Sequence, residues 1–265
     1  MKCHPTAVIH EATRISGEVT VGAYAVIEDG VEIGPGTVIR EHAVIRSGTI
    51  LGRNCVVDSH TVLGGLPQDL SFDPATPSGV RVGGNVTFRE GVTVNRATRE
   101  GKFTEIGNNC LLMATSHVGH DCVVGNNVIL ANAVLLAGKV TVGDFTFIGG
   151  SAAVHQFCRV GESAMIGGLA RVTQDLPPFC MMAERNQLVG LNLIGLKRRG
   201  FERETIKEIK RLYHLIYGVE GRPRILAAAA LKDGMAVTPE GLRFLEFMSA
   251  ESPKQVMRPR EARRE

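Results

Sequence analysis

Aliphatic side chains recur every six residues over most of the first 172 positions of this sequence. One uninterrupted run contains Ile9, Ile15, Val21, Ile27, Ile33, Ile39, Ile45, Leu51, Val57 and Leu63. A longer run contains Ile106, Leu112, Val118, Val124, Leu130, Leu136, Val142, Ile148, Val154, Val160, Ile166 and Val172, and a short run between them contains Val82, Phe88 and Val94. Helices repeat every 3.6 residues and strands every 2. A sustained period of six therefore predicts a parallel β-helix.

The neighbours of these aliphatic residues predict the shape of each coil. The position two residues earlier is small or β-branched, as at Ala25 and Val31, and it shares the inward face of a strand. The position just after is often glycine with Asn or Asp beside it, as at Gly107 and Asn108, and these residues tolerate positive φ at a corner. Three short strands and three tight corners give a triangular coil, and coils stack about 4.8 Å apart.

The hexads predict an all-β solenoid over residues 1–178, ended by a pair of prolines that cannot continue a strand ladder. Two segments interrupt the pattern. Residues 64–79 contain three prolines, and residues 98–103 have no inward aliphatic side chain. Both are expected to be loops thrown out from the solenoid, and loops on a rigid scaffold are frequent sites of function.

Residues 179–265 lose the period of six and are expected to form a connector and a C-terminal α-helical domain. Within Lys197–Gly218, apolar residues follow helical spacing with charges between them. They are Ile206, Ile209, Leu212, Tyr213 and Ile216. We expect this domain to cover the open end of the solenoid.

Composition favours a cytoplasmic protein. The sequence has no apolar run long enough to span a bilayer and no signal peptide, so membrane insertion is not expected. Four of its six cysteines occupy the small inward position of a hexad, which favours reduced core cysteines over disulfides. These are Cys55, Cys110, Cys122 and Cys158.

Positive charge is concentrated at the helical end. Residues 196–265 carry 16 basic and 10 acidic side chains, whereas residues 1–195 carry 14 and 17. Such a surface suits an acidic partner or phosphate groups, or it is simply a solvated helix face. Nucleic acid is not expected as a partner, because no aromatic residues alternate with the basic ones.

The 18-residue coil length aligns several polar residues on one edge of the solenoid. Adding 18 to His120 gives Gly138, which Lys139 follows, and adding 18 again gives Gln156, which follows His155. Stacking places these residues on three successive coils, with about 10 Å between His120 and His155. A base, a glycine N–H, a cation and a second imidazole in a row suit an elongated polar ligand.

The segment from His117 to Cys122 also has the residue types of a metal site. Cys122 occupies an inward position, however, while His120 lies at a corner, so their side chains diverge. No metal site is therefore expected here. A structural or surface role for each histidine is the other alternative.

Several segments resemble one family within the hexapeptide-repeat acyltransferase superfamily. They are HVGHDCVVGN, ILANAVLLAG, AVHQFCRVG, QDLPPF and GLNLIGLKRRGF. The sequence resembles the acyl-[acyl carrier protein]–UDP-N-acetylglucosamine O-acyltransferases over essentially its whole length. The resemblance implies a left-handed β-helix and a homotrimer with active sites between subunits. It also implies transfer of a 3-hydroxyacyl chain from acyl carrier protein to the 3-position of the sugar of UDP-N-acetylglucosamine, the first step of lipid A biosynthesis, without a cofactor.

The resemblance also implies roles for individual residues. His120 matches the general base, Asp121 a residue that orients it, and Gly138 the N–H donor to the oxyanion. Ten further positions match the substrate-binding region. They are Gln68 and Asp69 for the sugar and acyl chain, His117 in support, Lys139 beside the oxyanion glycine, His155 and Gln156 for the nucleotide, Gly168 for acyl-chain depth, and Asn192, Arg198 and Arg199 for uridine and phosphates.

Three positions depart from the family pattern. Lys139 replaces the usual His, Ser71 a Lys, and Ile194 a Glu. These changes leave acylation of a 3-amino analogue of the sugar as an alternative to acylation of the 3-hydroxyl. A zinc hydratase of the same fold and a non-catalytic scaffold are two further alternatives.

Overall fold

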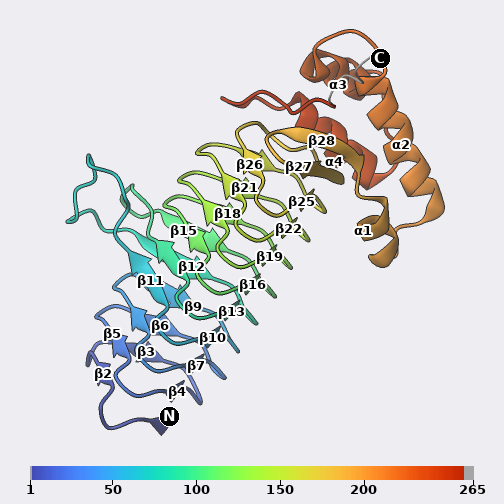
Figure 1. The fold of residues 1–265 in the computed structure, drawn as a ribbon. Coiled ribbons are helices and arrows are strands. Elements are labelled where there is room, and N and C mark those ends of the chain that lie inside the picture. Colours follow the sequence, from blue (N-terminus) through green and yellow to red (C-terminus); the bar gives the residue numbers. More distant parts are fainter. Residues whose placement is uncertain (1, 260–265) are drawn as a thin grey trace.

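The computed structural model describes residues 2–259, which form a three-sided parallel β-helix with helices at its C-terminal end (Figure 1). The strands form three sheets, named A, B and C here, and each coil contributes one strand to each sheet in the order A, B, C. The corner that follows a strand of sheet B is called the B–C corner, and the A–B and C–A corners are named in the same way.

The strands are short because the chain turns at every corner. Sheet A contains β1 (Lys2–Cys3), β4 (Thr20–Val21), β7 (Val38–Ile39), β10 (Val56–Val57), β13 (Thr87–Phe88), β16 (Leu111–Leu112), β19 (Ile129–Leu130), β22 (Phe147–Ile148), β25 (Met165–Ile166), β27 (Cys180–Ala183) and β28 (Gln187–Leu191). Sheet B contains β2 (Val8–Ile9), β5 (Val26–Ile27), β8 (Val44–Ile45), β11 (Val62–Gly65), β14 (Thr93–Asn95), β17 (His117–Val118), β20 (Leu135–Leu136), β23 (Ala153–Val154) and β26 (Arg171–Val172). Sheet C contains β3 (Arg14–Ile15), β6 (Glu32–Ile33), β9 (Thr49–Leu51), β12 (Gly79–Val82), β15 (Phe103–Ile106), β18 (Val123–Val124), β21 (Thr141–Val142) and β24 (Arg159–Val160).

The period of six gives the solenoid its core, as the sequence predicts. Residues 18 apart pair in parallel, for example Val38 with Val56 and His117 with Leu135. From Val21 onward, the repeated aliphatic residues of the three runs are buried inside the prism. Cys55, Cys110, Cys122 and Cys158 are buried in the same core and are free thiols, which confirms their predicted inward position.

The glycines that follow the inward aliphatic residues do not supply the positive φ that the sequence predicts for the corners. Positive φ occurs two residues later, at positions such as Tyr24 and Asn109. The glycines are required by the close approach of the next coil. A Cβ atom on Gly22 would lie 2.8 Å from the backbone nitrogen of Glu41, and one on Gly107 would lie 2.6 Å from the carbonyl oxygen of Gly125.

Two long connections leave the solenoid at the B–C corner. Residues 66–78 join β11 to β12, and residues 96–102 join β14 to β15. The two connections are bonded to each other, because Arg96 donates to the carbonyl oxygen of Pro74 (2.6 Å) and Ser78 to that of Ala97 (2.5 Å). The longer loop is thereby held against the shorter one.

The chain beyond residue 178 first extends sheet A and then forms helices. Strand β27 pairs in parallel with β25 despite the preceding prolines, and β28 pairs with β27 in the antiparallel direction. The helices are α1 (Leu193–Arg198), α2 (Arg203–Tyr217), α3 (Pro223–Lys232) and α4 (Pro239–Ser249). The boundary between two domains at residue 178 stays a prediction. The last six residues of the chain, 260–265, lie outside the described range.

The helix predicted within Lys197–Gly218 spans only Arg203–Tyr217, because Gly200 has a φ of +77° and interrupts helical geometry. The side chains of Ile209 and Leu212 on α2 are buried in a core continuous with that of the solenoid. Among residues 2–259, no helix has the length and apolar character needed to cross a membrane.

Candidate functional site

The B–C corner carries a groove of about 800 Å³ that crosses successive coils on the outer face of sheet B. Its floor includes outward side chains that stack from one strand to the next. These are Thr93, His117, Leu135, Ala153 and Arg171. The corner residues His120, Gly138, His155 and Gln156 also line it, as does Gln68 of the longer loop. The alignment predicted from the 18-residue period is therefore correct for His120, Gly138, His155 and Gln156.

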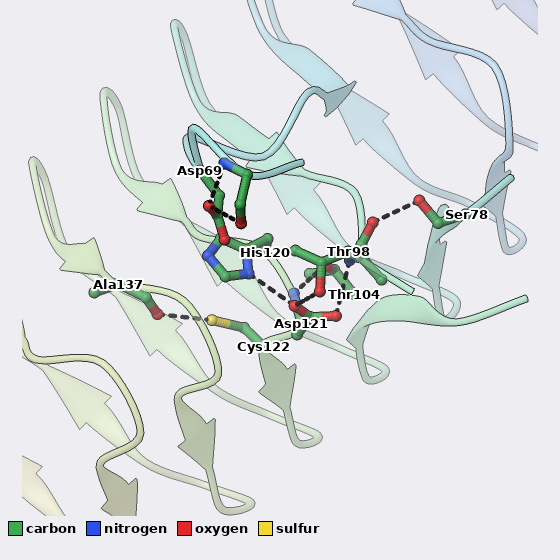
Figure 2. Close-up of polar contacts among 10 residues, drawn as sticks. Asp69, Ser78, Thr98, Thr104, His120, Asp121, Cys122 and Ala137 are labelled. Atoms are coloured by element: carbon green, nitrogen blue, oxygen red, sulfur yellow. Dashed lines mark hydrogen bonds and ion pairs between the residues drawn. The ribbon is translucent and has the colours of Figure 1, made fainter. Parts of the chain in front are cut away.

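His120 is held by a carboxylate that is itself held by a threonine (Figure 2). Its Nδ1 atom lies 2.7 Å from Oδ2 of Asp121. The hydroxyl of Thr98 donates to the same oxygen at 2.7 Å, and the backbone N–H of Thr98 donates to Oδ1 at 3.0 Å. The backbone N–H of Asp121 donates to the hydroxyl oxygen of Thr104 at 2.8 Å. Both carboxylate oxygens and the backbone N–H of Asp121 are thus held by hydrogen bonds. These bonds also fix the orientation of the imidazole.

The carboxylate of Asp121 is suited to remain charged. Burial raises its pKa, but the hydrogen bonds from His120 and Thr98 lower the pKa more, so the net shift is downward. A charged carboxylate accepts a hydrogen bond from the Nδ1–H of the neutral imidazole. His120 then has its lone pair on Nε2, where it can take a proton from a ligand in the groove.

Gly138 lies against the His120 ring. A Cβ atom at this position would be 2.5 Å from Cε1 of the imidazole, so no larger residue fits without displacing the ring. The chain on either side of Gly138 is bonded, since Ala137 donates to Val154 (3.0 Å) and Lys139 to His120 (2.8 Å). Among the described residues, no acceptor is bonded to the N–H of Gly138. This N–H and the His120 ring are neighbouring polar groups at the groove.

Asp69 lies next to His120, on the opposite side of the ring from Asp121 (Figure 2). Its Oδ1 accepts hydrogen bonds from the hydroxyl of Ser71 at 2.7 Å and from the backbone N–H of Ser71 at 2.9 Å. These bonds lower the pKa of Asp69, and the charges of His120 and Lys139 lower it further. Ser71 therefore orients the loop carboxylate.

His117 lies one strand below Leu135 on the groove floor, and its Nδ1 is 2.7 Å from the hydroxyl of Thr93. Burial lowers the pKa of His117, and the nearby His120 lowers it further. A neutral imidazole bonded to a threonine is a polar support for the groove floor.

At the B–C corner of the coil after that of His120, Lys139 extends over the ring of Phe157, with Nζ 5.2 Å from the ring centroid. It does not line the groove, unlike His155 and Gln156 on the next coil. The predicted row of groove residues is thus interrupted at Lys139, whose ammonium group packs against an aromatic face.

The remaining predicted positions do not line the groove. Gly168 is exposed at the A–B corner, after β25. Asn192 caps α1 by accepting from the N–H of Gly195 at 3.0 Å, and it donates to the carbonyl oxygen of Ser163 at the C–A corner (3.0 Å). Arg199 donates to the Ser163 hydroxyl and its guanidinium lies 3.6 Å from the centroid of the Phe145 ring.

Arg198 is exposed at the end of α1, next to Arg199. Since the groove is at the B–C corner, a single chain does not bring Arg198, Arg199, Asn192 or Gly168 together with His120.

Sequence reasoning missed Thr98, Thr104 and Thr93. Thr98 lies in the loop of residues 96–102, where coil counting does not apply. Thr93 pairs with His117 across 24 residues and not 18, because the same loop lengthens that coil. Of the three, only Thr104 has a signal in the sequence, because it occupies the inward position two residues before Ile106.

Within residues 2–259, no group of three or more His, Cys, Asp or Glu side chains is arranged to hold a metal ion. Cys122 has its thiol in the core, where it donates to the carbonyl oxygen of Ala137 at 3.1 Å. It therefore points away from the groove that His120 lines, as its hexad position predicts.

The bonds of Thr98 give a testable prediction. We expect Thr98→Val to lower the turnover of the acyl transfer that the resemblance implies by at least about tenfold, because it removes one hydrogen bond to a charged carboxylate, and such bonds are worth about 1.5–3 kcal/mol. Thr98→Ser keeps the hydroxyl and is expected to retain turnover near the wild-type value. Equal turnover by the valine and serine variants would show that the hydroxyl does not orient the pair.

Comparisons with known proteins agree with this geometry. Residues 175–257 match the family model described as Udp N-acetylglucosamine O-acyltransferase, Domain 2, and residues 12–47 and 103–138 match bacterial transferase hexapeptide repeats. The acyl-[acyl-carrier-protein]–UDP-N-acetylglucosamine O-acyltransferase of Stenotrophomonas maltophilia is 43% identical over 256 residues, which is 95% of this chain and 97% of that protein. The corresponding enzyme of Campylobacter jejuni subsp. doylei is 44% identical, over 82% of each chain.

The fold agrees as well. The structure of UDP-N-acetylglucosamine acyltransferase from Campylobacter jejuni matches with a TM-score of 0.90 and 36% identity, covering 98% of this chain and 100% of that one. The three sheets are thus those of the left-handed parallel β-helix that the resemblance implied. With identity above 40% over nearly the full length of a relative, this chain belongs to the UDP-N-acetylglucosamine O-acyltransferase family.

Proposed function

We propose that this acyltransferase moves a 3-hydroxyacyl chain from acyl carrier protein to the 3-hydroxyl of the sugar of UDP-N-acetylglucosamine, which is the first step of lipid A biosynthesis. The observation that carries the proposal is the arrangement of His120 in the groove. The imidazole is oriented by Asp121 (2.7 Å) and packs on Gly138, whose N–H is unbonded within the described part of the chain.

In the proposed reaction His120 is the general base. Nε2 takes the proton of the sugar 3-hydroxyl as its oxygen attacks the thioester carbonyl carbon. The N–H of Gly138 donates to the oxyanion of the tetrahedral intermediate. The C–S bond then breaks, the imidazolium returns the proton to the leaving thiolate, and the products are the 3-O-acyl sugar nucleotide and the free thiol of the carrier protein. Asp121 holds the imidazole and stabilises its positive charge.

The proposal assigns substrate positions along the groove. Gln68, Asp69 and His117 contact the sugar or acyl chain near His120, and His155 and Gln156 contact the nucleotide on a higher coil. Lys139 supports the B–C corner beside these residues. The acyl chain arrives already activated as a thioester, so the reaction needs no cofactor.

A homotrimer is part of the proposal. Asn192, Arg198 and Arg199 are expected to reach uridine and phosphates, yet Asn192 and Arg199 contact the C–A corner and none of the three lines the groove of its own chain. A neighbouring copy can supply them. Outward apolar side chains on the solenoid are consistent with such an interface, since Leu135 is 50% exposed and Leu169 is 78% exposed.

A cytoplasmic location completes the proposal. All six cysteines are free thiols, five of them buried, as is usual in a reducing compartment. The basic helical end suits docking of the acidic carrier protein.

A substrate panel tests the proposal. The purified protein is offered UDP-N-acetylglucosamine or its 3-amino analogue, each with 3-hydroxyacyl carrier proteins of several chain lengths. The proposal expects an ester of the first acceptor as the main product. Exclusive amide formation on the analogue would replace this function by that of an N-acyltransferase.

Gly168 gives a prediction about acyl-chain length. Leu169 carries the positive φ of +59° at this corner, so Gly168 is not needed to turn the chain. A Cβ atom on Gly168 would meet only the backbone of Gly150, with its carbonyl oxygen 3.3 Å away. Because each buried CH₂ contributes about 0.8 kcal/mol, the absence of a side chain here favours a long acyl chain.

We therefore expect Gly168→Met to shorten the preferred donor while activity on the shorter donor is retained. Donors that differ by two or four carbons are compared side by side. An unchanged length preference, or equal slowing with every donor, would remove Gly168 from the acyl-binding region.

A further inference from the structure

The C-terminal segment, residues 250–259, returns from α4 to the solenoid (Figure 1, red). The segment pairs with the chain just after β26. Asp175 donates from its N–H to the carbonyl oxygen of Gln255, and Met257 donates to that of Asp175, both at 2.9 Å. The carbonyl oxygen of Met257 accepts a bond from the hydroxyl of Tyr217 at 2.8 Å. The backbone on the C-terminal side of Lys254 is therefore fixed against the last coils.

Lys254 contacts the imidazole of His155, which lines the groove. Its Nζ atom lies 3.1 Å from Nδ1 of His155, although the two residues are 99 positions apart in the chain. No carboxylate of residues 2–259 lies within 4.0 Å of this ammonium group. Its positive charge is therefore available to a ligand.

The contact selects one tautomer of His155. An ammonium group can only donate, so Nδ1 must accept and the ring proton must be on Nε2. The carbonyl oxygen of Gln156, 3.2 Å from Nδ1, favours the opposite tautomer. The bond from the charged donor is the stronger of the two. Lys254 thus leaves His155 as a donor through Nε2–H, next to a second donor, the ammonium group itself.

We propose that Lys254 is a specificity-determining residue for the nucleotide diphosphate: it fixes His155 as the Nε2–H tautomer and adds a positive charge beside it. Two neighbouring donors, one of them cationic, match the anionic oxygens of a diphosphate. This inference rests on the proposed function, in which His155 contacts the nucleotide.

The test compares Lys254→Met and Lys254→Arg with the wild-type protein. Lys232→Met, at the end of α3 and exposed, is the matched control. We expect Lys254→Met to raise the KM for UDP-N-acetylglucosamine about tenfold, the range for one charged hydrogen bond, with kcat and the KM for the acyl donor unchanged. Lys254→Arg restores much of the loss, and Lys232→Met has no effect.

Two further measurements use readouts other than turnover. Nitrogen chemical shifts of labelled His155 report the tautomer, which is expected to be Nε2–H in the wild type and mixed in Lys254→Met. Calorimetric titration with UDP alone should show about tenfold weaker binding by Lys254→Met. A wild type that binds UDP with this lysine dependence but acylates no acceptor would refute the proposed function alone. An active wild type whose UDP binding and nucleotide KM do not change in Lys254→Met would refute the role of Lys254 alone.

Discussion

Replacing His120 by alanine is expected to lower kcat by about 10²–10⁴-fold, the usual contribution of a general base. His120 is 8% exposed, and its imidazole lines the groove and is bonded to Asp121, so its removal takes away the proton acceptor and leaves the apolar core intact. Turnover is measured with saturating acyl donor and acceptor, and the melting temperature and oligomeric state are measured on the same preparation.

His42→Ala is the matched control for this experiment. His42 is also a corner histidine, but it lies at the A–B corner between the rings of Tyr24 and His60, with ring centroids 5.2 and 5.0 Å away. Its loss is expected to leave turnover unchanged. If His120→Ala kept most of its activity while it remained folded, another group would have to be the base.

Gly138→Ala is expected to reduce turnover about 10²–10³-fold, the range observed when one oxyanion donor is lost. The added Cβ atom would lie 2.5 Å from Cε1 of His120, so the ring must move away from the attacking hydroxyl. It would also crowd the position next to the N–H of Gly138. The φ of Gly138 is not positive, so alanine causes no backbone strain there.

Gly167→Ala is the matched control, because the nearest atom to its Cβ would be the carbonyl oxygen of Met182 at an ordinary 3.5 Å. We expect that variant to fold and turn over like the wild type. A Gly138→Ala variant with unreduced kcat would mean that neither the space beside this N–H nor the ring position matters for the reaction.

The sequence predicts the solenoid well because its physical signal is local and repeated. Each inward aliphatic residue from Val21 onward is buried as its position predicts, and the period of 18 correctly aligns His120 with Gly138 on adjacent coils. The same period does not determine the hand of the coil, which followed from the resemblance alone. It also gave the wrong reason for the glycines, because the separation between coils, and not φ, excludes a side chain at Gly22.

Two of the contacts that sequence reasoning missed come from segments without a period. Thr98 reaches Asp121 from a loop, and Lys254 reaches His155 from a segment 99 residues away. Neither contact leaves a pattern in the chain, since each depends on how an irregular segment folds back on the prism. The separation of Arg199 from His120 on different corners likewise becomes apparent only in three dimensions.

The most direct test of the acyl-transfer account is a single-turnover reaction of the wild-type protein with 3-hydroxyacyl carrier protein and UDP-N-acetylglucosamine, followed by mass spectrometry and NMR of the product. The account predicts one sugar nucleotide carrying one acyl group as an ester at the 3-position, with one free carrier-protein thiol released for each ester formed. Release of free fatty acid without acylated nucleotide, or an acyl group at any other position of the sugar, would contradict it.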